Sequence, residues 1–299
     1  MKTVEEGTQL SDPVTSFDPL DATTVFVLGQ DGNLWLEHGP FGTVPPKREL
    51  VDANLSDFRA LDAQTVYVLR SDGTLWLEPG PFGTVSPQRE QVDATVVRFA
   101  PVDAATVYVL RSDATLWLER GPFGTVSPQR EQVDATVVRF APVDAATVYV
   151  LRSNGTLWLE HGPFGTAAPS PERVDASVVS FAPVDAATVY VLRSDGTLWL
   201  ERGPFGTAAP SPEPVDASVV SFAPLDAATV YVLRSDGKLW LERGPFGTAA
   251  PQPRTRRRQR GQLRPSGCGH RLCAGQRREA VVDAGTLWPG PQSESPAGR

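Results

Sequence analysis

Short apolar runs separated by turn residues recur along the chain, and residues 95–132 show the pattern well. Val96–Phe99 and Thr106–Leu110 are rich in β-branched and aromatic residues, and a segment with proline and aspartate lies between them. This order is typical of a strand, a turn and a second strand. Apolar residues fill nearly every position of Thr106–Leu110, which indicates a strand that is buried on both faces.

A tight hairpin and two further strands follow in the same stretch. Arg111–Ala114 stands where other copies carry Ser-Asp-Gly or Ser-Asn-Gly, which favour the positive φ angles of a hairpin turn. Thr115–Glu119 is the third predicted strand, and the connection after it holds too much Gly and Pro for a helix. Arg130–Val133 is a short polar fourth strand, suited to an exposed sheet edge. Ala114 replaces the turn glycine, at a cost of about 1 kcal/mol if its φ is positive.

This pattern occurs six times with a period of 41 residues, and the last copy lacks its fourth strand. One tryptophan in each copy marks the period: Trp35, Trp76, Trp117, Trp158, Trp199 and Trp240. A repeat of roughly 40 residues with no helical periodicity is typical of propeller blades, which bury both faces of each sheet. We therefore predict an all-β fold, a β-propeller of six four-stranded blades over residues 1–253. A β-solenoid is the alternative, although its coils are usually shorter.

A closed ring requires a fourth strand for the last copy, because an unrelated sequence follows that copy. Gly7–Ser11 aligns with Arg89–Asp93, the fourth strand of another copy. We therefore expect the N-terminal segment to close a six-bladed ring. The alternative is an open ring, an incomplete version of a seven-bladed one. A closed ring predicts a monomer, whereas an open ring predicts self-association through its exposed edges.

Residues 254–299 differ from the repeats and hold ten arginines against three acidic residues. A shifted reading frame explains them better than a nucleic-acid-binding arm. Codons that fit His270–Cys273 read Thr-Val-Tyr-Val one base later, and the hidden tyrosine and tryptophan then fall 41 residues after Tyr231 and Trp240. We infer a one-base insertion near residues 250–253 that hides a seventh blade. The translated basic tail is expected to be disordered and to bind no nucleic acid.

Composition argues against several classes of function. No apolar run approaches the roughly 18 residues needed to span a membrane, and residues 1–12 lack a signal-peptide pattern. The default expectation is therefore a cytoplasmic protein without membrane contact. Both cysteines lie in the tail, and the three histidines show no triad or metal-ligand spacing. We expect no catalysis, no cofactor and no metal site.

Two recurring groups are candidates for ligand binding. In a four-strand meander, the loop after the first strand and the loop after the third emerge on the same face. A carboxylate beside an exposed aromatic ring in each copy would suit a polyol. The candidates are Asp21, Asp62, Asp103, Asp144, Asp185 and Asp226, with Phe41, Phe82, Phe123, Phe164, Phe205 and Phe246. The alternative is structural: each Asp caps its own turn, and each Phe holds its loop against the blade.

The six tryptophans offer another possible set of platforms for stacking sugars. Each is flanked by leucines in the middle of a strand buried on both faces. We therefore favour a role as a spacer between neighbouring blades. The tyrosines of the second strands are core residues by the same argument.

The hairpin V-Y-V-L-x-S-D-G-x-L-W-L-E, with its D-G turn and single tryptophan, resembles the tachylectin and tectonin type of β-propeller lectins. The resemblance runs from Val14 to about Ala250 and transfers no particular binding residue. It implies carbohydrate binding at several equivalent sites. The sequence thus predicts a non-catalytic, multivalent, glycan-binding propeller. The alternatives are a scaffold for protein–protein interaction and a recently amplified repeat with no settled function.

Overall fold

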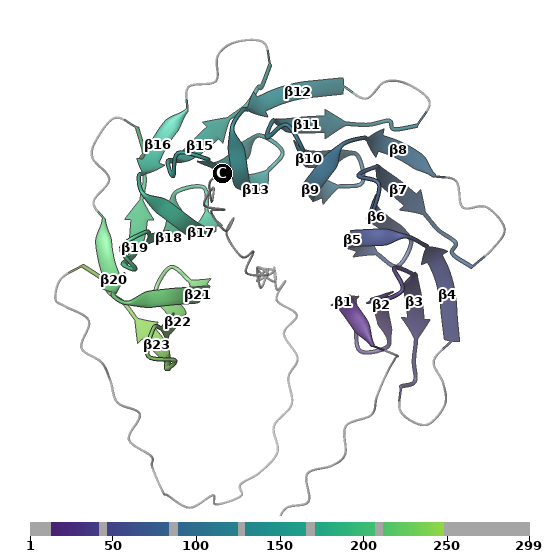
Figure 1. Cartoon of the computed structure of the whole chain (residues 1–299), viewed down its shortest axis with the longest axis horizontal. Coiled ribbons are helices and arrows are strands. Elements are labelled where there is room, and N and C mark those ends of the chain that lie inside the picture. Colours follow the sequence, from purple (N-terminus) through teal and green to yellow (C-terminus); the bar gives the residue numbers. More distant parts are fainter. Residues whose placement is uncertain are drawn as a thin grey trace, which may run out of the picture. The chain divides into compact units, whose positions relative to one another are not determined.

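The computed structural model describes residues 13–41, 47–83, 89–124, 129–165, 171–206 and 212–247. All of them belong to one compact unit that spans residues 1–251. They form 23 β-strands and, within these ranges, no helix. Figure 1 shows the strands as six successive sheets, one for each copy of the repeat. The predicted all-β fold of repeated blades is confirmed.

Five sheets have four antiparallel strands in chain order. The first sheet is β1 (Val14–Pro19), β2 (Thr24–Gly29), β3 (Leu34–His38) and β4 (Lys47–Asp52). The second is β5 (Leu55–Asp62), β6 (Thr65–Arg70), β7 (Leu75–Pro79) and β8 (Glu90–Asp93). The third is β9 (Val96–Asp103), β10 (Thr106–Arg111), β11 (Leu116–Arg120) and β12 (Gln129–Asp134). The fourth is β13 (Val137–Asp144), β14 (Thr147–Arg152), β15 (Leu157–His161) and β16 (Glu172–Asp175). The fifth is β17 (Val178–Asp185), β18 (Thr188–Arg193), β19 (Leu198–Arg202) and β20 (Glu213–Asp216).

The sixth sheet has three described strands, β21 (Val219–Asp226), β22 (Thr229–Arg234) and β23 (Leu239–Arg243). Its predicted fourth strand, Gly7–Ser11, lies outside the described residues, as does the tail, residues 254–299. Closure of the ring, the hidden seventh blade and the disorder of the tail therefore stay predictions.

The first strand of a blade is longer than predicted. β9 continues through Ala100–Asp103, where the sequence pattern indicated a turn. Ala100 and Val102 pack against a buried apolar cluster, which favours extended backbone at these positions. Pro101 has no N–H to donate, and the pairing with β10 shifts register beside it, between Thr106 and Val107. The turn itself is shortened to Ala104 and Ala105.

Turn chemistry sets the hairpin between the second and third strands. Leu110 pairs with Leu116 across the turn, and Asp113 Oδ1 accepts hydrogen bonds from the Thr115 backbone N–H and hydroxyl at 3.0 and 2.6 Å. The glycine at the end of the other copies' turn has a positive φ, for example 77° at Gly155. Ala114 occupies that position with a φ of 66°, which confirms the expected strain.

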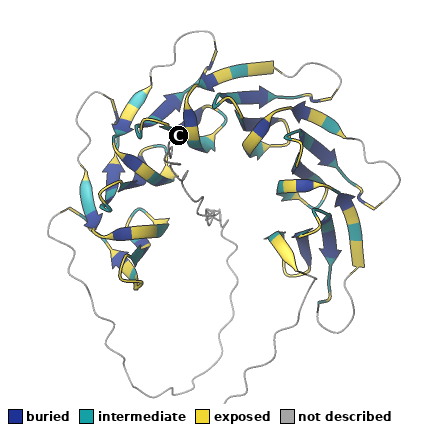
Figure 2. Cartoon of the chain, viewed as in Figure 1, coloured by how far each residue is buried: buried dark blue, intermediate teal, exposed yellow. Residues whose placement is uncertain are grey.

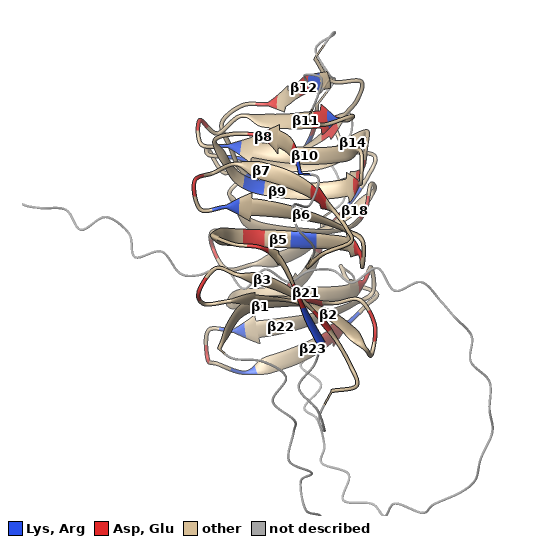
Figure 3. Cartoon of the chain, turned by 90° about the vertical axis from the view of Figure 1, so that its right-hand side faces the viewer, with Lys and Arg blue, Asp and Glu red and all other residues tan. Residues whose placement is uncertain are grey.

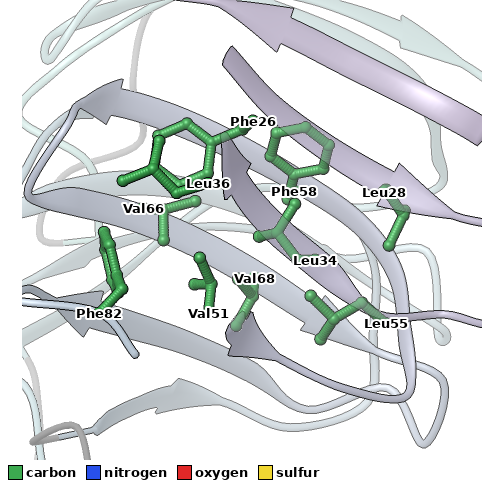
Figure 4. Close-up of a cluster of buried hydrophobic side chains, with 10 residues drawn as sticks. All are labelled: Phe26, Leu28, Leu34, Leu36, Val51, Leu55, Phe58, Val66, Val68 and Phe82. Atoms are coloured by element: carbon green, nitrogen blue, oxygen red, sulfur yellow. The ribbon is translucent and has the colours of Figure 1, made fainter. Parts of the chain in front are cut away.

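The core lies between sheets, and each pair of neighbouring sheets shares one apolar cluster. Figure 4 shows the first cluster, which joins Phe26, Leu28, Leu34, Leu36 and Val51 of the first sheet to Leu55, Phe58, Val66, Val68 and Phe82 of the second. The same positions form the four later clusters. Buried residues therefore concentrate in the second and third strands (Figure 2). We call the side of a sheet that contacts the next sheet its forward face, and the opposite side its rear face.

Candidate functional site

The six predicted aspartates sit at the turns after the first strands and bind their own turns. In the third sheet, Asp103 Oδ1 accepts a hydrogen bond from the backbone N–H of Ala105 at 2.8 Å. The other five accept the equivalent bond from the residue two positions on: Asp21, Asp62, Asp144, Asp185 and Asp226. Each carboxylate thus stabilises its own turn.

The predicted phenylalanines lie mostly in the interior. Phe123 packs edge-on against Tyr67 of the preceding sheet, with ring centroids 6.4 Å apart. Its equivalents Phe82, Phe164 and Phe205 are buried in the same way. Phe41 and Phe246, in the two end sheets, are partly exposed. The middle sheets therefore offer no exposed ring beside the aspartate, and a binding role for these twelve residues stays a prediction.

A charged cluster surrounds each tryptophan from the second sheet onward. In the third sheet the guanidinium of Arg111, at the end of β10, lies 4.8 Å from the centroid of the Trp117 ring. Arg111 Nε also lies 2.7 Å from Asp93 Oδ2, at the end of β8 in the preceding sheet. The arginine therefore combines a cation–π contact within its sheet with an ion pair between sheets.

The same arrangement recurs in the other sheets that carry this arginine. The equivalent trios are Arg70, Trp76 and Asp52; Arg152, Trp158 and Asp134; Arg193, Trp199 and Asp175; and Arg234, Trp240 and Asp216. Figure 3 shows Lys and Arg near the ends of several strands, and both red and blue segments within β5. These trios were not predicted from the sequence. The available signal was the arginine that directly follows the apolar run of the second strand in five copies.

A buried glutamate completes each cluster. Glu119 is fully buried, and its carboxylate lies 3.4 Å from Arg111 and 3.0 Å from Arg130. Burial raises the pKa of Glu119 to about 7 despite these arginines. Burial likewise raises the pKa of Glu160 and of Glu201 to about 7. These carboxyl groups are therefore costly to ionise inside the blade stack.

The first sheet differs, because Gly29 occupies the position of Arg70 and its equivalents. A pocket of about 250 Å³ lies over Trp35 on the rear face of this sheet. Its lining comprises Pro13, Val14, Val27, Gly29, Gln30, Asp31, Trp35, Glu37 and Arg48. The loss of one arginine side chain thus opens the space that the guanidinium fills in the other copies.

The pocket combines an indole ring with polar groups. Arg48 Nε lies 2.9 Å from Glu37 Oε1, and this ion pair borders the space beside Trp35. Gln30 and Asp31 supply further hydrogen-bonding groups. The pocket is smaller than the roughly 300–1,000 Å³ of sites for drug-sized ligands, so it suits one small ring or one side chain.

Within the described ranges, no group of three or more His, Cys, Asp or Glu residues is arranged to hold a metal ion. The same part of the chain contains no helix long and apolar enough to cross a membrane.

Comparison with known proteins supports the fold. No protein-family model and no curated protein matches the sequence. Among solved structures, YCF48 from Cyanidioschyzon merolae is similar with a TM-score of 0.51 and 14% identity, over 74% of this chain and 80% of that chain. A chain in the crystal structure of Kap60 bound to yeast RCC1 (Prp20) gives a TM-score of 0.48 and 12% identity, over 80% and 74%. Human WBSCR16 gives 0.45 and 13%, over 73% of each chain. These are β-propeller proteins, and the tectonin type is not identified among them.

Proposed function

We propose that this chain is a non-catalytic binding propeller, that its ligand site is the pocket over Trp35, and that its ligand is a small carbohydrate. The observation that carries the proposal is the indole ring that Gly29 leaves without an arginine above it. The apolar face of a pyranose ring can stack on an aromatic face, and planar polar groups such as those of Gln30 and Asp31 can bind its hydroxyl groups.

The position is accessible to solvent even where sheets cover one another. The side chains of Arg111 and Arg193, which fill the equivalent space, remain partly exposed in the middle of the stack. A ligand over Trp35 would therefore have a route to the pocket. The proposal places one site in the first sheet, and the several equivalent sites expected from the lectin resemblance stay a prediction.

Glycan-array screening followed by titration calorimetry tests the proposal. Gly29→Arg is the matched variant, because five other sheets already carry arginine there. A Cβ at Gly29 would lie 2.5 Å from Asp31 Oδ1, the end of a side chain that can rotate away. We expect a weak sugar ligand for the wild-type chain, and loss of its binding in Gly29→Arg. The proposal of a carbohydrate ligand would be rejected if no glycan bound, or if Gly29→Arg bound as well as the wild type.

A specific observation favours a second candidate, a scaffold that receives an arginine side chain from a protein partner. In five sheets the equivalent space holds a guanidinium, 4.5 to 5.0 Å from the indole centroid and beside a buried glutamate. The pocket over Trp35 keeps the indole and the buried Glu37. Titration with a short arginine-containing peptide and its lysine and citrulline counterparts discriminates between the carbohydrate-binding propeller and the protein scaffold. Binding of the arginine peptide alone, lost in Gly29→Arg, would favour the scaffold over the lectin.

A further inference from the structure

The sixth sheet presents an apolar forward face that other sheets bury. Leu239 is 68% exposed and Tyr231 is 39% exposed, whereas their equivalents Leu198 and Tyr190 in the fifth sheet are 0% exposed. Leu241 is exposed on the same face. These residues occupy the positions that form the apolar clusters between the preceding sheets.

The first sheet presents the complementary rear face. Phe17, on β1, is 67% exposed, whereas Phe58 and Phe99 at the same position of the next sheets are 2% and 3% exposed. β1 is accordingly the most exposed part of this sheet in Figure 2. Val25 and Val27 of the same face are buried, so the exposed apolar surface is concentrated along β1.

These two faces are the halves of an interface that the chain builds five times. At each internal interface, one aromatic residue and three leucines of one forward face contact the valines and the phenylalanine of the next rear face; the aromatic residue is Phe26 at the first interface and a tyrosine at the other four. The sixth sheet carries the same forward residues, Tyr231, Leu233, Leu239 and Leu241. The rear residues of the first sheet, Phe17, Val25 and Val27, match those of the later sheets. The two end faces therefore carry the same kinds of apolar residues, at the same positions, as the faces that pack together inside the stack.

The described residues of the two end faces lack both partners of the ion pair that joins neighbouring sheets inside the stack. At internal interfaces, the fourth strand of one sheet supplies an aspartate to the arginine of the next, as Asp93 does for Arg111. The three described strands of the sixth sheet include no such strand. The first sheet has Gly29 in place of the arginine. Contact between these two faces therefore leaves no buried arginine without its carboxylate, which would be costly.

We propose that the forward face of the sixth sheet binds the rear face of the first sheet of a second copy of this chain. In a single chain, Leu239 of the forward face and Phe17 of the rear face are both exposed. Because the two faces differ, the contact is head-to-tail, and each bound pair still offers one face of each kind. Association therefore continues into longer chains of copies or a ring of several copies, instead of stopping at a symmetric dimer.

Sedimentation velocity and light scattering of the full chain over a wide concentration range test this proposal. We expect the mean mass to rise with concentration. Leu239→Glu and Phe17→Glu each place a charge on one face at a residue already exposed in the single chain, so both variants should fold. Each alone should raise the dissociation constant by at least about tenfold, because a carboxylate is expensive to bury in an apolar contact.

Mixing the variants is the decisive measurement. Leu239→Glu keeps an intact rear face and Phe17→Glu keeps an intact forward face, so an equimolar mixture should form a one-to-one pair that neither forms alone. Val97→Glu, at an exposed position of β9 away from both end faces, is the matched control and should associate like the wild type. A wild-type chain that stays monomeric at every concentration would indicate closure within one chain and overturn the proposal. Unchanged association of either variant, or no pair in the mixture, would overturn it equally.

Discussion

The guanidinium of Arg193 lies 4.5 Å from the centroid of the Trp199 ring, and its Nε lies 2.7 Å from Oδ2 of Asp175 in the preceding sheet. One side chain therefore covers an indole ring and links two blades. The same pair of contacts occurs in every sheet from the second to the sixth. Only the first sheet, with Gly29, departs from it among the six described.

Removal of this arginine should destabilise the stack. Arg193→Ala deletes the cation–π contact and leaves Asp175 without its guanidinium, which should lower the free energy of unfolding by about 1–3 kcal/mol. It should also open a pocket over Trp199 like the one over Trp35. Urea unfolding followed by tryptophan fluorescence measures the loss of stability, and a crystal structure of the variant shows whether the pocket opens. The control is Arg243→Ala at an exposed position, which should cost less than about 0.5 kcal/mol. Equal costs for the two variants would contradict the structural role of Arg193.

Replacement of the turn residue Ala114 by glycine should stabilise the protein. Its φ of 66° is strained for alanine but not for glycine. Ala114→Gly should therefore raise the free energy of unfolding by up to about 1 kcal/mol. Gly155→Ala, at the equivalent turn of the next sheet, should lower it by a similar amount. Denaturant midpoints of the two variants would refute the argument if both shifted in the same direction.

Two tyrosines at equivalent positions should respond differently to loss of their hydroxyl groups. Tyr149 donates a hydrogen bond to the backbone carbonyl of Asp185 or Ala186, at 3.2 or 3.1 Å. The Tyr108 hydroxyl is buried without a hydrogen-bond partner among the described residues. Tyr149→Phe should therefore cost about 1 kcal/mol, whereas Tyr108→Phe should be neutral or stabilising. Thermal unfolding of the two variants checks this, and a larger loss in Tyr108→Phe would be inconsistent with the structure.

Stability should fall as pH rises from about 4.5 to about 7. Burial raises the pKa of Glu201 from 4.5 to about 7, and its Oε2 is buried without a hydrogen-bond partner among the described residues. When folding raises the pKa of a carboxyl group, its contribution to stability is largest below the pKa of the unfolded state. The contribution is lost as the pH rises to the pKa of the folded state. The free energy of unfolding should therefore decrease between pH 4.5 and about 7.

Comparison with Glu201→Gln isolates this contribution, because glutamine cannot ionise and resembles the neutral carboxyl group. The difference in unfolding free energy between variant and wild type should grow in favour of the variant as pH rises. Urea unfolding at a series of pH values measures that difference. A difference that does not change with pH would show that Glu201 titrates normally.

Much of the local structure was predictable because neighbouring residues determine it. The run Thr106–Leu110 indicated a strand buried on both faces, and β10 is such a strand. The missing turn glycine at Ala114 indicated a strained φ, and the structure has it. The structural alternative for Asp103, a cap on its own turn, also follows from residues two positions apart. The length of β9 was underestimated, because packing of Ala100 and Val102 against the next sheet outweighs the turn tendency of the proline between them.

The candidate site was harder to predict, because it depends on contacts between copies. Nothing in the local sequence around Phe123 shows that Tyr67, in the preceding sheet, covers its ring. The pairing of Arg111 with Asp93 likewise joins charged residues that each resemble ordinary surface in the sequence. Gly29 is visible in an alignment of the six copies, but the pocket over Trp35 follows only from knowing what the other arginines cover.

The sequence by itself determined the period of 41 residues, the strands and the turn chemistry, because strand formation and turn φ angles depend on residues close together in the chain. The tertiary structure decided which side of each strand is covered, and by what. Phe58 and Phe17 have equivalent places in the repeat, yet Phe58 is buried and Phe17 is exposed. The first sheet packs against Phe58, whereas no described sheet precedes Phe17. Burial depends on the contact between neighbouring blades, so equivalent residues of near-identical copies differ in exposure where a neighbour is missing.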